Sequence, residues 1–184
     1  MKTTTLLAAV AALALTPAVA QAEAFNGAYG GVELGWESNR SNLGDGFNYG
    51  LVAGYNKKVA DSLVLGVEGK AGLSTADKDF TLGGTETEVE AGRSLGIAAR
   101  VGVLATPQTM VYGKIGYENV RTKVKIEDAL GKTKNGFNTD ALVLGAGVEH
   151  AFTSNTTFRV GYDYTDGEDG FRRHAVKSAV AFHF

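Results

Sequence analysis

The chain has no cysteine and only two prolines among its 184 residues. Without cysteine there is no thiol nucleophile, no thiolate metal site and no disulfide, so other interactions must stabilise the fold. The formal net charge is −2, and no basic patch is interleaved with aromatic residues, so the composition gives no support to a nucleic-acid partner. Glycine is abundant, with 25 residues, and the length fits a single domain.

The chain also lacks any long apolar helix. Its longest apolar run, Leu6–Leu15, has about ten residues, whereas a membrane-spanning helix needs roughly 20. Lys2 precedes this run and the small residues of Ala20–Ala22 follow it, as in a secretory signal peptide. We therefore expect a signal peptide over 1–22, cleaved to leave 23–184, with an alternative cleavage site after Ala20. If the mature chain is a membrane protein, it must be a barrel, since barrels are the other structure that satisfies every backbone group in lipid.

The stretch Arg173–Phe184 alternates in character at every second residue. One face is mostly apolar and carries His174, Val176, Ser178, Val180, Phe182 and Phe184; the other carries Arg173, Ala175, Lys177, Ala179, Ala181 and His183. Side chains alternate across a β-strand, so this pattern predicts one strand with an apolar face and a polar or small face. Two phenylalanines at a free edge would be unfavourable in a soluble sheet, but they are favourable on a barrel surrounded by lipid.

Seven similar runs precede this last strand and are separated by polar or turn-forming stretches. The predicted strands are 25–38, 46–59, 63–75, 91–105, 109–124, 139–152, 156–165 and 173–184. The connections alternate long and short, with short turns at 60–62, 106–108 and 153–155 and long charged loops at 76–90 and 125–138. This asymmetry is typical of outer-membrane barrels, whose periplasmic turns are short and whose outer loops are long.

Alternation within each run divides the wall into two faces. In 63–73, for example, Leu65 and Val67 lie opposite Glu68 and Lys70. A soluble barrel would place the apolar set inside, and a membrane barrel would place it against lipid. The signal peptide, the loop asymmetry and the terminal Phe184 favour the membrane barrel, with the polar and glycine-rich set in the lumen.

The predicted lumen face carries five acids and five bases. They are Glu33, Glu68, Glu118, Glu149 and Asp163, and Lys70, Arg100, Lys114, Arg159 and Lys177. A charge desolvated alone costs several kcal/mol, so a matched set predicts a network of ion pairs across the barrel. Its role is either a structural plug or a gate that selects ions, and we favour the plug because eight strands leave little interior room.

Aromatic residues gather towards the strand ends on the predicted lipid face, where interfacial girdles belong. They are Trp36, Phe47, Tyr55, Tyr117, Phe152, Phe158, Tyr164, Phe182 and Phe184. Tyr29 and Tyr112 are exceptions because the alternation points them inward. Either they pack in the lumen or the assigned phase is wrong at those positions.

Residues for catalysis or metal binding are scarce. His150 and His183 are predicted near the periplasmic end and His174 at the outer rim, so a three-histidine metal site is not expected. His174 and Ser178 share a face but lie roughly 13 Å apart along a strand, which is beyond hydrogen-bond reach. Glycine pairs such as Gly145–Gly147 precede no helix, so they indicate relief of crowding in the lumen rather than a phosphate loop. We therefore expect no catalytic site, no cofactor and no metal.

Three segments together resemble the eight-stranded outer-membrane β-barrel family that includes OmpA transmembrane domains and opacity-like surface antigens. They are Gly27–Trp36, which is similar to the family's opening strand, Val160–Tyr164, similar to its penultimate strand, and the terminal Phe184. The resemblance implies an all-β, eight-stranded antiparallel up-and-down transmembrane barrel over 23–184 in the outer membrane of a Gram-negative bacterium. OmpA's peptidoglycan-binding domain is not expected in this chain.

The same resemblance implies the partners. These are outer-membrane lipid and lipopolysaccharide, together with periplasmic chaperones and the barrel assembly machinery, for which Val180, Phe182 and Phe184 would form the recognition signal. The acidic loop 77–90 and the basic loop 123–134 are candidates for contacts with a host surface, a phage or a cation, although a solvated loop is the simpler interpretation. The expected function is a structural or surface-interaction barrel with a filled lumen. A narrow passive pore is the alternative, and a lipid-modifying enzyme is a distant third.

Overall fold

The computed structural model describes residues 24–39, 45–82, 85–128 and 131–184. The predicted signal peptide, 1–22, lies outside the described residues. The described ranges contain nine strands: β1 (Gly27–Asn39), β2 (Asp45–Lys58), β3 (Leu63–Ser74), β4 (Asp77–Leu82), β5 (Thr85–Thr106), β6 (Thr109–Asp128), β7 (Gly131–Ala151), β8 (Thr156–Gly167) and β9 (Arg172–His183), with a 3₁₀ turn, η2 (Glu168–Gly170), before the last. Among the described residues, no helix is both long and apolar enough to cross a membrane.

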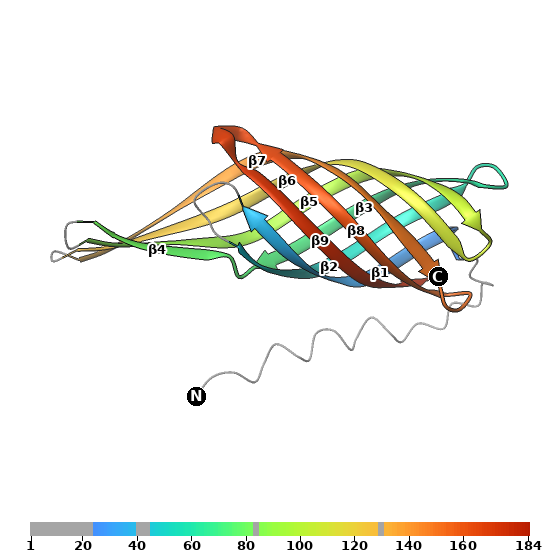
Figure 1. Cartoon of the computed structure of the whole chain (residues 1–184), viewed down its shortest axis with the longest axis horizontal. Helices are drawn as coiled ribbons and strands as arrows, with labels where there is room; N and C mark the ends of the chain where they lie inside the picture. Colours follow the sequence, from blue (N-terminus) through green and yellow to red (C-terminus); the bar gives the residue numbers. More distant parts are fainter. Residues whose placement is uncertain (1–23, 40–44, 83–84, 129–130) are drawn as a thin grey trace, which may run out of the picture.

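Eight of these strands close into an antiparallel barrel (Figure 1). Each pairs with its neighbour in the chain, β9 returns to pair with β1, and β3 pairs with β5, which completes the ring. Between β1 and β2 the register runs without a shift from Gly27↔Asn56 to Ser38↔Asp45, whereas the β5–β6 ladder shifts register between Ala91 and Ser94 and again between Leu104 and Thr106. Closure leaves the barrel wall with no unpaired edge, so every strand in it has hydrogen-bonded neighbours on both sides. The predicted eight-stranded antiparallel barrel is confirmed.

The ninth strand, β4, corrects the sequence prediction. Residues 76–90 and 125–138 were expected to be loops, but β4 pairs with the first part of β5, and the hairpin between β6 and β7 continues in register to Asp128↔Gly131. Both segments carry many charges, which the prediction took as a mark of loops. A sheet with water on both sides can carry polar residues on both faces, so charge does not end these strands.

As a result, part of the sheet projects beyond the barrel. β5, β6 and β7 have 20 to 22 residues, whereas the other five barrel strands have 12 to 14. The surplus of roughly eight residues corresponds to about 25 Å along a strand. Together with β4 these extensions form a sheet that extends outward from one end of the barrel, and we call it the projecting sheet (Figure 1). We call that end the sheet end.

The opposite end carries the three short connections, and we call it the turn end. These connections follow β2, β5 and β7. The predicted turns at 60–62 and 153–155 fall within them, and the one at 106–108 differs by one residue, since Thr106 is the last residue of β5. Leu63 N donates to Ala60 O at 3.2 Å, and Phe152 N donates to Thr156 O at 3.0 Å, so the backbone closes these turns by itself. The carboxyl terminus also lies at the turn end (Figure 1).

The two faces of the wall have opposite character. The outward face is lined by exposed apolar side chains such as Leu51, Val67 and Ile97, and the inward face by buried charged ones such as Glu68 and Arg100. β9 shows the alternation along its whole length, since each inward residue from Arg173 to His183 is buried. The assigned faces are therefore confirmed, and the wall has the inverse of a water-soluble protein's pattern.

Candidate functional site

The interior of the barrel holds a dense set of buried charges. All ten predicted lumen residues point inward, and the structure adds Glu37 and Arg173, which gives six acids and six bases. They come from β1, β3, β5, β6, β7, β8 and β9, so nearly the whole circumference contributes. Because each side chain arises from a fixed position in the ladder, barrel closure determines which charges meet.

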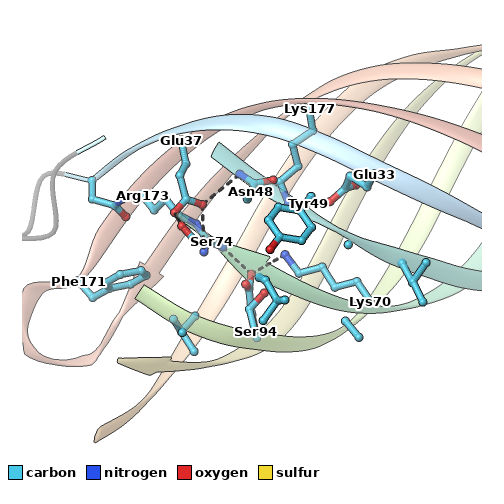
Figure 2. A pocket seen from close by; sticks show the side chains of 18 residues that line it. Glu33, Glu37, Asn48, Tyr49, Lys70, Ser74, Ser94, Phe171, Arg173 and Lys177 are labelled. Atoms are coloured by element: carbon cyan, nitrogen blue, oxygen red, sulfur yellow. Dashed lines mark hydrogen bonds and ion pairs between the residues drawn. The ribbon is translucent and has the colours of Figure 1, made fainter. Parts of the chain in front are cut away.

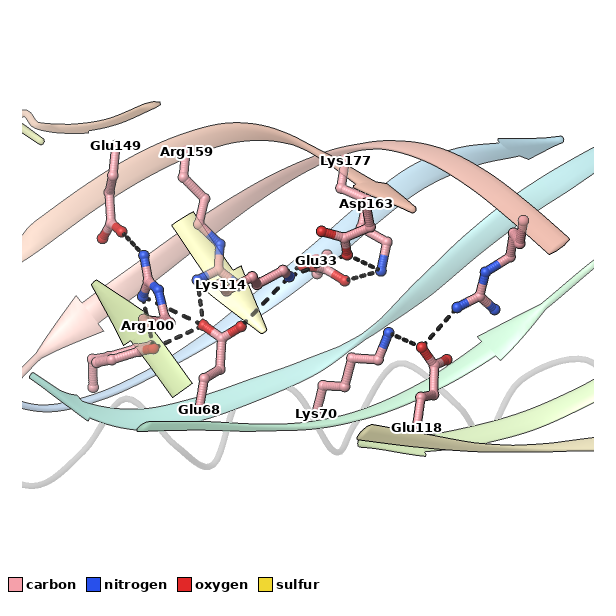
Figure 3. Close-up of polar contacts among 12 residues, drawn as sticks. Glu33, Glu68, Lys70, Arg100, Lys114, Glu118, Glu149, Arg159, Asp163 and Lys177 are labelled. Carbon is pink, nitrogen blue, oxygen red and sulfur yellow. Dashed lines mark hydrogen bonds and ion pairs between the residues drawn. The ribbon is translucent and has the colours of Figure 1, made fainter. Parts of the chain in front are cut away.

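The part of this network nearest the turn end is centred on Glu68 (Figure 3). Glu68 Oε2 accepts hydrogen bonds from Arg159 Nη1 and, at 2.7 Å, from the hydroxyl of Tyr29. Arg100 Nη1 donates to the same hydroxyl at 2.8 Å, and Arg100 Nη2 donates to Glu149 at 2.7 Å. Glu68 is on β3 and Arg159 on β8, so this contact crosses the lumen rather than joining neighbouring strands.

The middle of the network joins β1, β6, β8 and β9. Lys177 Nζ donates to Glu33 Oε1 at 2.9 Å and lies 3.2 Å from Asp163 Oδ2. Lys114 Nζ lies 3.1 Å from the same Asp163 oxygen, so two ammonium groups share one carboxylate. These contacts continue without a break from the Glu68 group, because Arg159 Nη2 also donates to Glu33 at 3.3 Å.

The sheet-end part of the network surrounds a small hollow (Figure 2). Glu118 Oε2 is contacted by Lys70 Nζ and by Arg173 Nη2, each at 2.7 Å. Glu37 accepts hydrogen bonds from Ser74 at 2.5 Å and Asn48 at 3.0 Å. The hollow, which Glu37 and Glu118 both line, has a volume of about 30 Å³, which is room for about two water molecules. This volume is too small to form a wide water channel.

The predicted set of lumen charges left out two members of this network, Glu37 and Arg173, although Arg173 had been assigned to the same face of the last strand as Lys177. Both are buried, and Arg173 Nη1 lies 3.7 Å from Glu37 Oε2. The signal was available: Glu37 is four residues from Glu33 and Arg173 is four residues from Lys177, so alternation places each on the same face as a predicted lumen charge.

An apolar cluster fills the lumen at the turn end, between the charge network and the short connections. Phe25, Val64, Met110, Tyr112 and Ala151 pack together there, and Phe25 and Met110 are each only 1% exposed. Phe25 takes a positive φ of 68°, which is uncommon for a residue other than glycine. The packing of its ring inside the barrel and beside His183 therefore maintains a strained backbone conformation.

Tyr29 and Tyr112 lie in the lumen, which settles the two exceptions in the aromatic pattern. The Arg100 guanidinium lies 4.4 Å from the centre of the Tyr112 ring. Glycines on adjacent strands make the room: a Cβ added at Gly54 would lie 2.5 Å from the Tyr29 hydroxyl, and one added at Gly147 would lie 2.7 Å from that of Tyr112. The inward glycines therefore leave the space that these tyrosine rings occupy.

The three histidines are dispersed. His183 is buried in the lumen beside Thr157, His150 contacts Thr109 at 2.9 Å, and His174 faces outward between Tyr162 and Tyr164. In the part of the chain that the structure describes, no group of three or more histidine, aspartate or glutamate side chains is arranged to hold a metal ion.

The predicted aromatic girdles lie on the outward face. Trp36 packs edge-on against Phe47 at 4.7 Å near the sheet end, and Tyr55, Phe152 and Phe182 are exposed towards the turn end. Phe184 N donates to Ala28 O at 2.9 Å, so the ladder extends to the last residue. Recognition of Val180, Phe182 and Phe184 by the assembly machinery stays a prediction.

The fold and its inverted faces agree with the comparison to known families. A family model described as "Outer membrane protein beta-barrel domain" matches residues 5–184. The chain belongs to this family. It is therefore an outer-membrane β-barrel protein, as the resemblance in its strands implied.

Curated relatives support the same assignment. The 25 kDa outer-membrane immunogenic protein of Brucella ovis is 30% identical over 176 residues, which cover 90% of this chain and 81% of the relative. The 22 kDa outer membrane protein of Rhizobium leguminosarum bv. viciae is 32% identical over 151 residues, 76% of this chain and 67% of the relative. The 31 kDa outer-membrane immunogenic protein of Brucella melitensis is 35% identical over 136 residues, 66% of this chain, but the match spans only 54% of that relative's length.

Solved structures share the fold at low sequence identity. Neisserial surface protein A matches with a TM-score of 0.58 and 18% identity, covering 86% of this chain and 98% of its own. Ail, the attachment invasion locus protein of Yersinia pestis, crystallised with the heparin analogue sucrose octasulfate, matches with a TM-score of 0.57 and 13% identity, covering 86% and 99%. At these identities the likeness establishes the barrel fold alone.

Proposed function

We propose that this protein is a surface protein whose barrel is a closed anchor and whose projecting sheet makes the external contacts. The observation that carries this proposal is the combination of a filled lumen with strands β5, β6 and β7 that continue far beyond the barrel. A channel would need an open interior, and a purely structural barrel would not need the extensions. Short turns lie on the periplasmic side of such barrels, so the sheet end faces outward.

The composition of the projecting sheet suits contact with charged surfaces. Its β4 and β5 portion is rich in acids, with Glu86, Glu88 and Glu90, and its β6–β7 hairpin carries Lys123, Lys125, Lys132 and Lys134. A host surface or a phage is the class of partner that these charges would meet. Ail was solved with a sulphated ligand, which makes sulphated polysaccharides a reasonable first probe for the basic hairpin.

The alternatives are less well supported. In a narrow pore, an ion or small solute would have to pass the cross-lumen contact of Glu68 with Arg159 and the apolar cluster around Phe25. The names of the relatives describe outer-membrane proteins, and none describes an enzyme. His174 faces outward beside two tyrosines rather than beside a serine and a carboxylate, so a lipid-modifying activity has no nucleophile arrangement there.

A membrane-impermeant amine reagent applied to intact cells tests the proposed display. We expect labelling of Lys123, Lys125, Lys132 and Lys134 in the projecting sheet and none of Lys57, which lies at the end of β2 beside the turn end. Permeabilising the outer membrane should expose Lys57, while the buried Lys114 and Lys177 should react only after unfolding. Labelling of Lys57 in intact cells, with the lysines of the projecting sheet protected, would show that the turn end faces outward and would contradict the proposal. Peptide mass spectrometry identifies the modified residues.

A further inference from the structure

The projecting sheet has two open edges, unlike the closed wall of the barrel. β4 stands at one end of the strand order, and residues 77–82 pair with β5 alone in the described part of the chain. On the other side, β7 pairs with β8 only from Ala141 onward, so its residues 131–140 pair with β6 alone among the residues described. Each edge therefore presents a row of backbone groups with which another strand can pair.

The two open edges lie at the same level of the sheet. The ladders connect Asp77 of β4 to Gly136 of β7, through one residue each of β5 and β6. By the same pairing, residues 77–81 of β4 correspond to residues 132–136 of β7. Three strand spacings, or about 14 Å, separate the edges, so β4 and β7 of one copy cannot pair with each other.

Strand direction favours pairing between edges of opposite kind. β4 runs away from the barrel and β7 runs toward it, because each strand of the projecting sheet is antiparallel to the next (Figure 1). Two copies in one membrane are related by rotation about the membrane normal, so their strands keep these directions. β4 of one copy beside β7 of another is therefore antiparallel, which continues the alternation of the sheet. Two β4 strands, or two β7 strands, would instead be parallel.

The two edges also differ in the sign of their charge. β4 carries Asp77, Lys78 and Asp79, whereas the corresponding part of β7 carries Lys132 and Lys134 and no acid. Charged residues at a sheet edge usually prevent pairing with another chain. Because like charges directly opposite each other are destabilising, these residues oppose the pairing of two like edges and favour β4 beside β7. In a register that keeps the two edges level, Asp79 of one copy would be opposite Lys134 of the other.

We propose that the projecting sheets of two copies of this protein pair edge to edge, with β4 of one copy beside residues 131–136 of β7 of the other. The partner of each open edge is the opposite edge of a second copy in the same membrane. Membrane insertion holds both sheets at one height and in compatible directions before they meet, which lowers the entropic cost of association. Each copy has one edge of each kind, so the contact is heterologous and extends into a ring or a row.

Disulfide cross-linking tests this pairing, because the chain has no cysteine of its own. One variant carries Phe80→Cys and a second carries Thr133→Cys, since these positions are opposite each other when the edges are level. The two proteins are refolded together into phosphatidylcholine vesicles, checked by heat-dependent gel mobility, mildly oxidised and separated on a non-reducing gel. We expect cross-linked dimers to be about fivefold more abundant in the mixture than with either variant alone, because like edges repel.

Charge reversal tests the opposite signs of the two edges. Asp79→Lys in the Phe80→Cys chain should lower the yield of cross-linked dimer about fivefold, because it places a lysine near the lysines of β7. Lys134→Asp in the Thr133→Cys chain should then restore the yield. Recovery by the second substitution shows that the first did not act by unfolding the sheet.

Two sets of controls cover register and random collision. Gly131→Cys and Asn135→Cys, two residues to either side of Thr133, replace Thr133→Cys in turn and detect a shifted register. Ser62→Cys mixed with Ser154→Cys places the cysteines in connections at the turn end, so its yield measures collision between barrels.

Two results would overturn the proposal. One is a mixture that cross-links no better than the single variants or the turn-end control at all three β7 positions, and the other is a yield that Asp79→Lys leaves unchanged. The pairing does not depend on which side of the membrane the projecting sheet faces. It can therefore fail while lysine labelling of intact cells succeeds, and the reverse.

Discussion

Replacing Glu68 by alanine should lower the free energy of unfolding by about 3–5 kcal/mol, because the change leaves buried positive charge without its partner. Glu68 accepts hydrogen bonds from Arg159 and Tyr29 and lies 3.5 Å from Arg100 Nη1. Its side chain is 3% exposed, so water cannot replace the lost carboxylate without entering the lumen. Reversible urea unfolding in lipid vesicles, followed by tryptophan fluorescence, measures the change.

The matched control for this experiment is Asp166→Ala. Asp166 also pairs with an arginine, Arg172, but both side chains are about half exposed. Exposed ion pairs contribute at most about 1 kcal/mol, so this variant should unfold almost as the unaltered protein does. If the Glu68 and Asp166 variants lost equal stability, the lumen would be well hydrated and the account of a filled, paired interior would be wrong.

Introducing arginine at Leu51 should destabilise the protein by about 2–4 kcal/mol, the cost of a cation on the lipid face near the bilayer midplane. Leu51 is exposed on β2, and it lies four residues from Phe47 on one side and four from Tyr55 on the other. Those two aromatic residues belong to opposite girdles, so Leu51 is near the middle of the apolar band. The same unfolding assay applies.

Val59→Arg is the control for the lipid-facing substitution. Val59 is as exposed as Leu51, but it lies in the short turn after β2, outside the apolar band. Surface substitutions of this kind usually change stability by no more than about 0.5 kcal/mol. Equal effects at the two positions would mean that the exposed apolar face is not embedded in hydrocarbon.

The faces and the closure of the barrel were predictable because the alternation has a period of two and is sustained over long strands. Leu65 and Glu68 could be assigned to opposite faces, and even Tyr29 and Tyr112 were assigned inward against the general aromatic pattern. Alternation is a local property of the strand backbone, so the two faces can be recognised in the sequence without knowing which strands pair. The same rule would have identified Glu37 and Arg173.

Other features depend on contacts that a single strand does not encode. Glu68 meets Arg159 because closure brings β3 opposite β8, and the stagger of the closed sheet is not a property of either strand alone. The β4 strand was missed because a charged strand in water differs little in composition from a loop. The unusual backbone of Phe25 depends on an apolar recess assembled from β3, β6 and β7, which are far away in the chain.

Several expectations extend beyond the described contacts. Recognition of the terminal strand by the assembly machinery, handling by periplasmic chaperones, and removal of 1–22 remain predictions. They concern transport and folding in the cell, whereas the contacts described above concern the folded barrel. The lumen network and the projecting sheet do not depend on them.

Single-channel conductance of the refolded protein in a planar bilayer tests the closed lumen most directly. Insertion is verified first by heat-dependent gel mobility, so that a silent bilayer cannot be mistaken for missing protein. The account predicts no stable conductance steps, because ion pairs cross the lumen and the apolar cluster around Phe25 closes its turn end. Reproducible steps of constant size from the unaltered protein would contradict it and would make the twelve lumen charges determinants of a small pore.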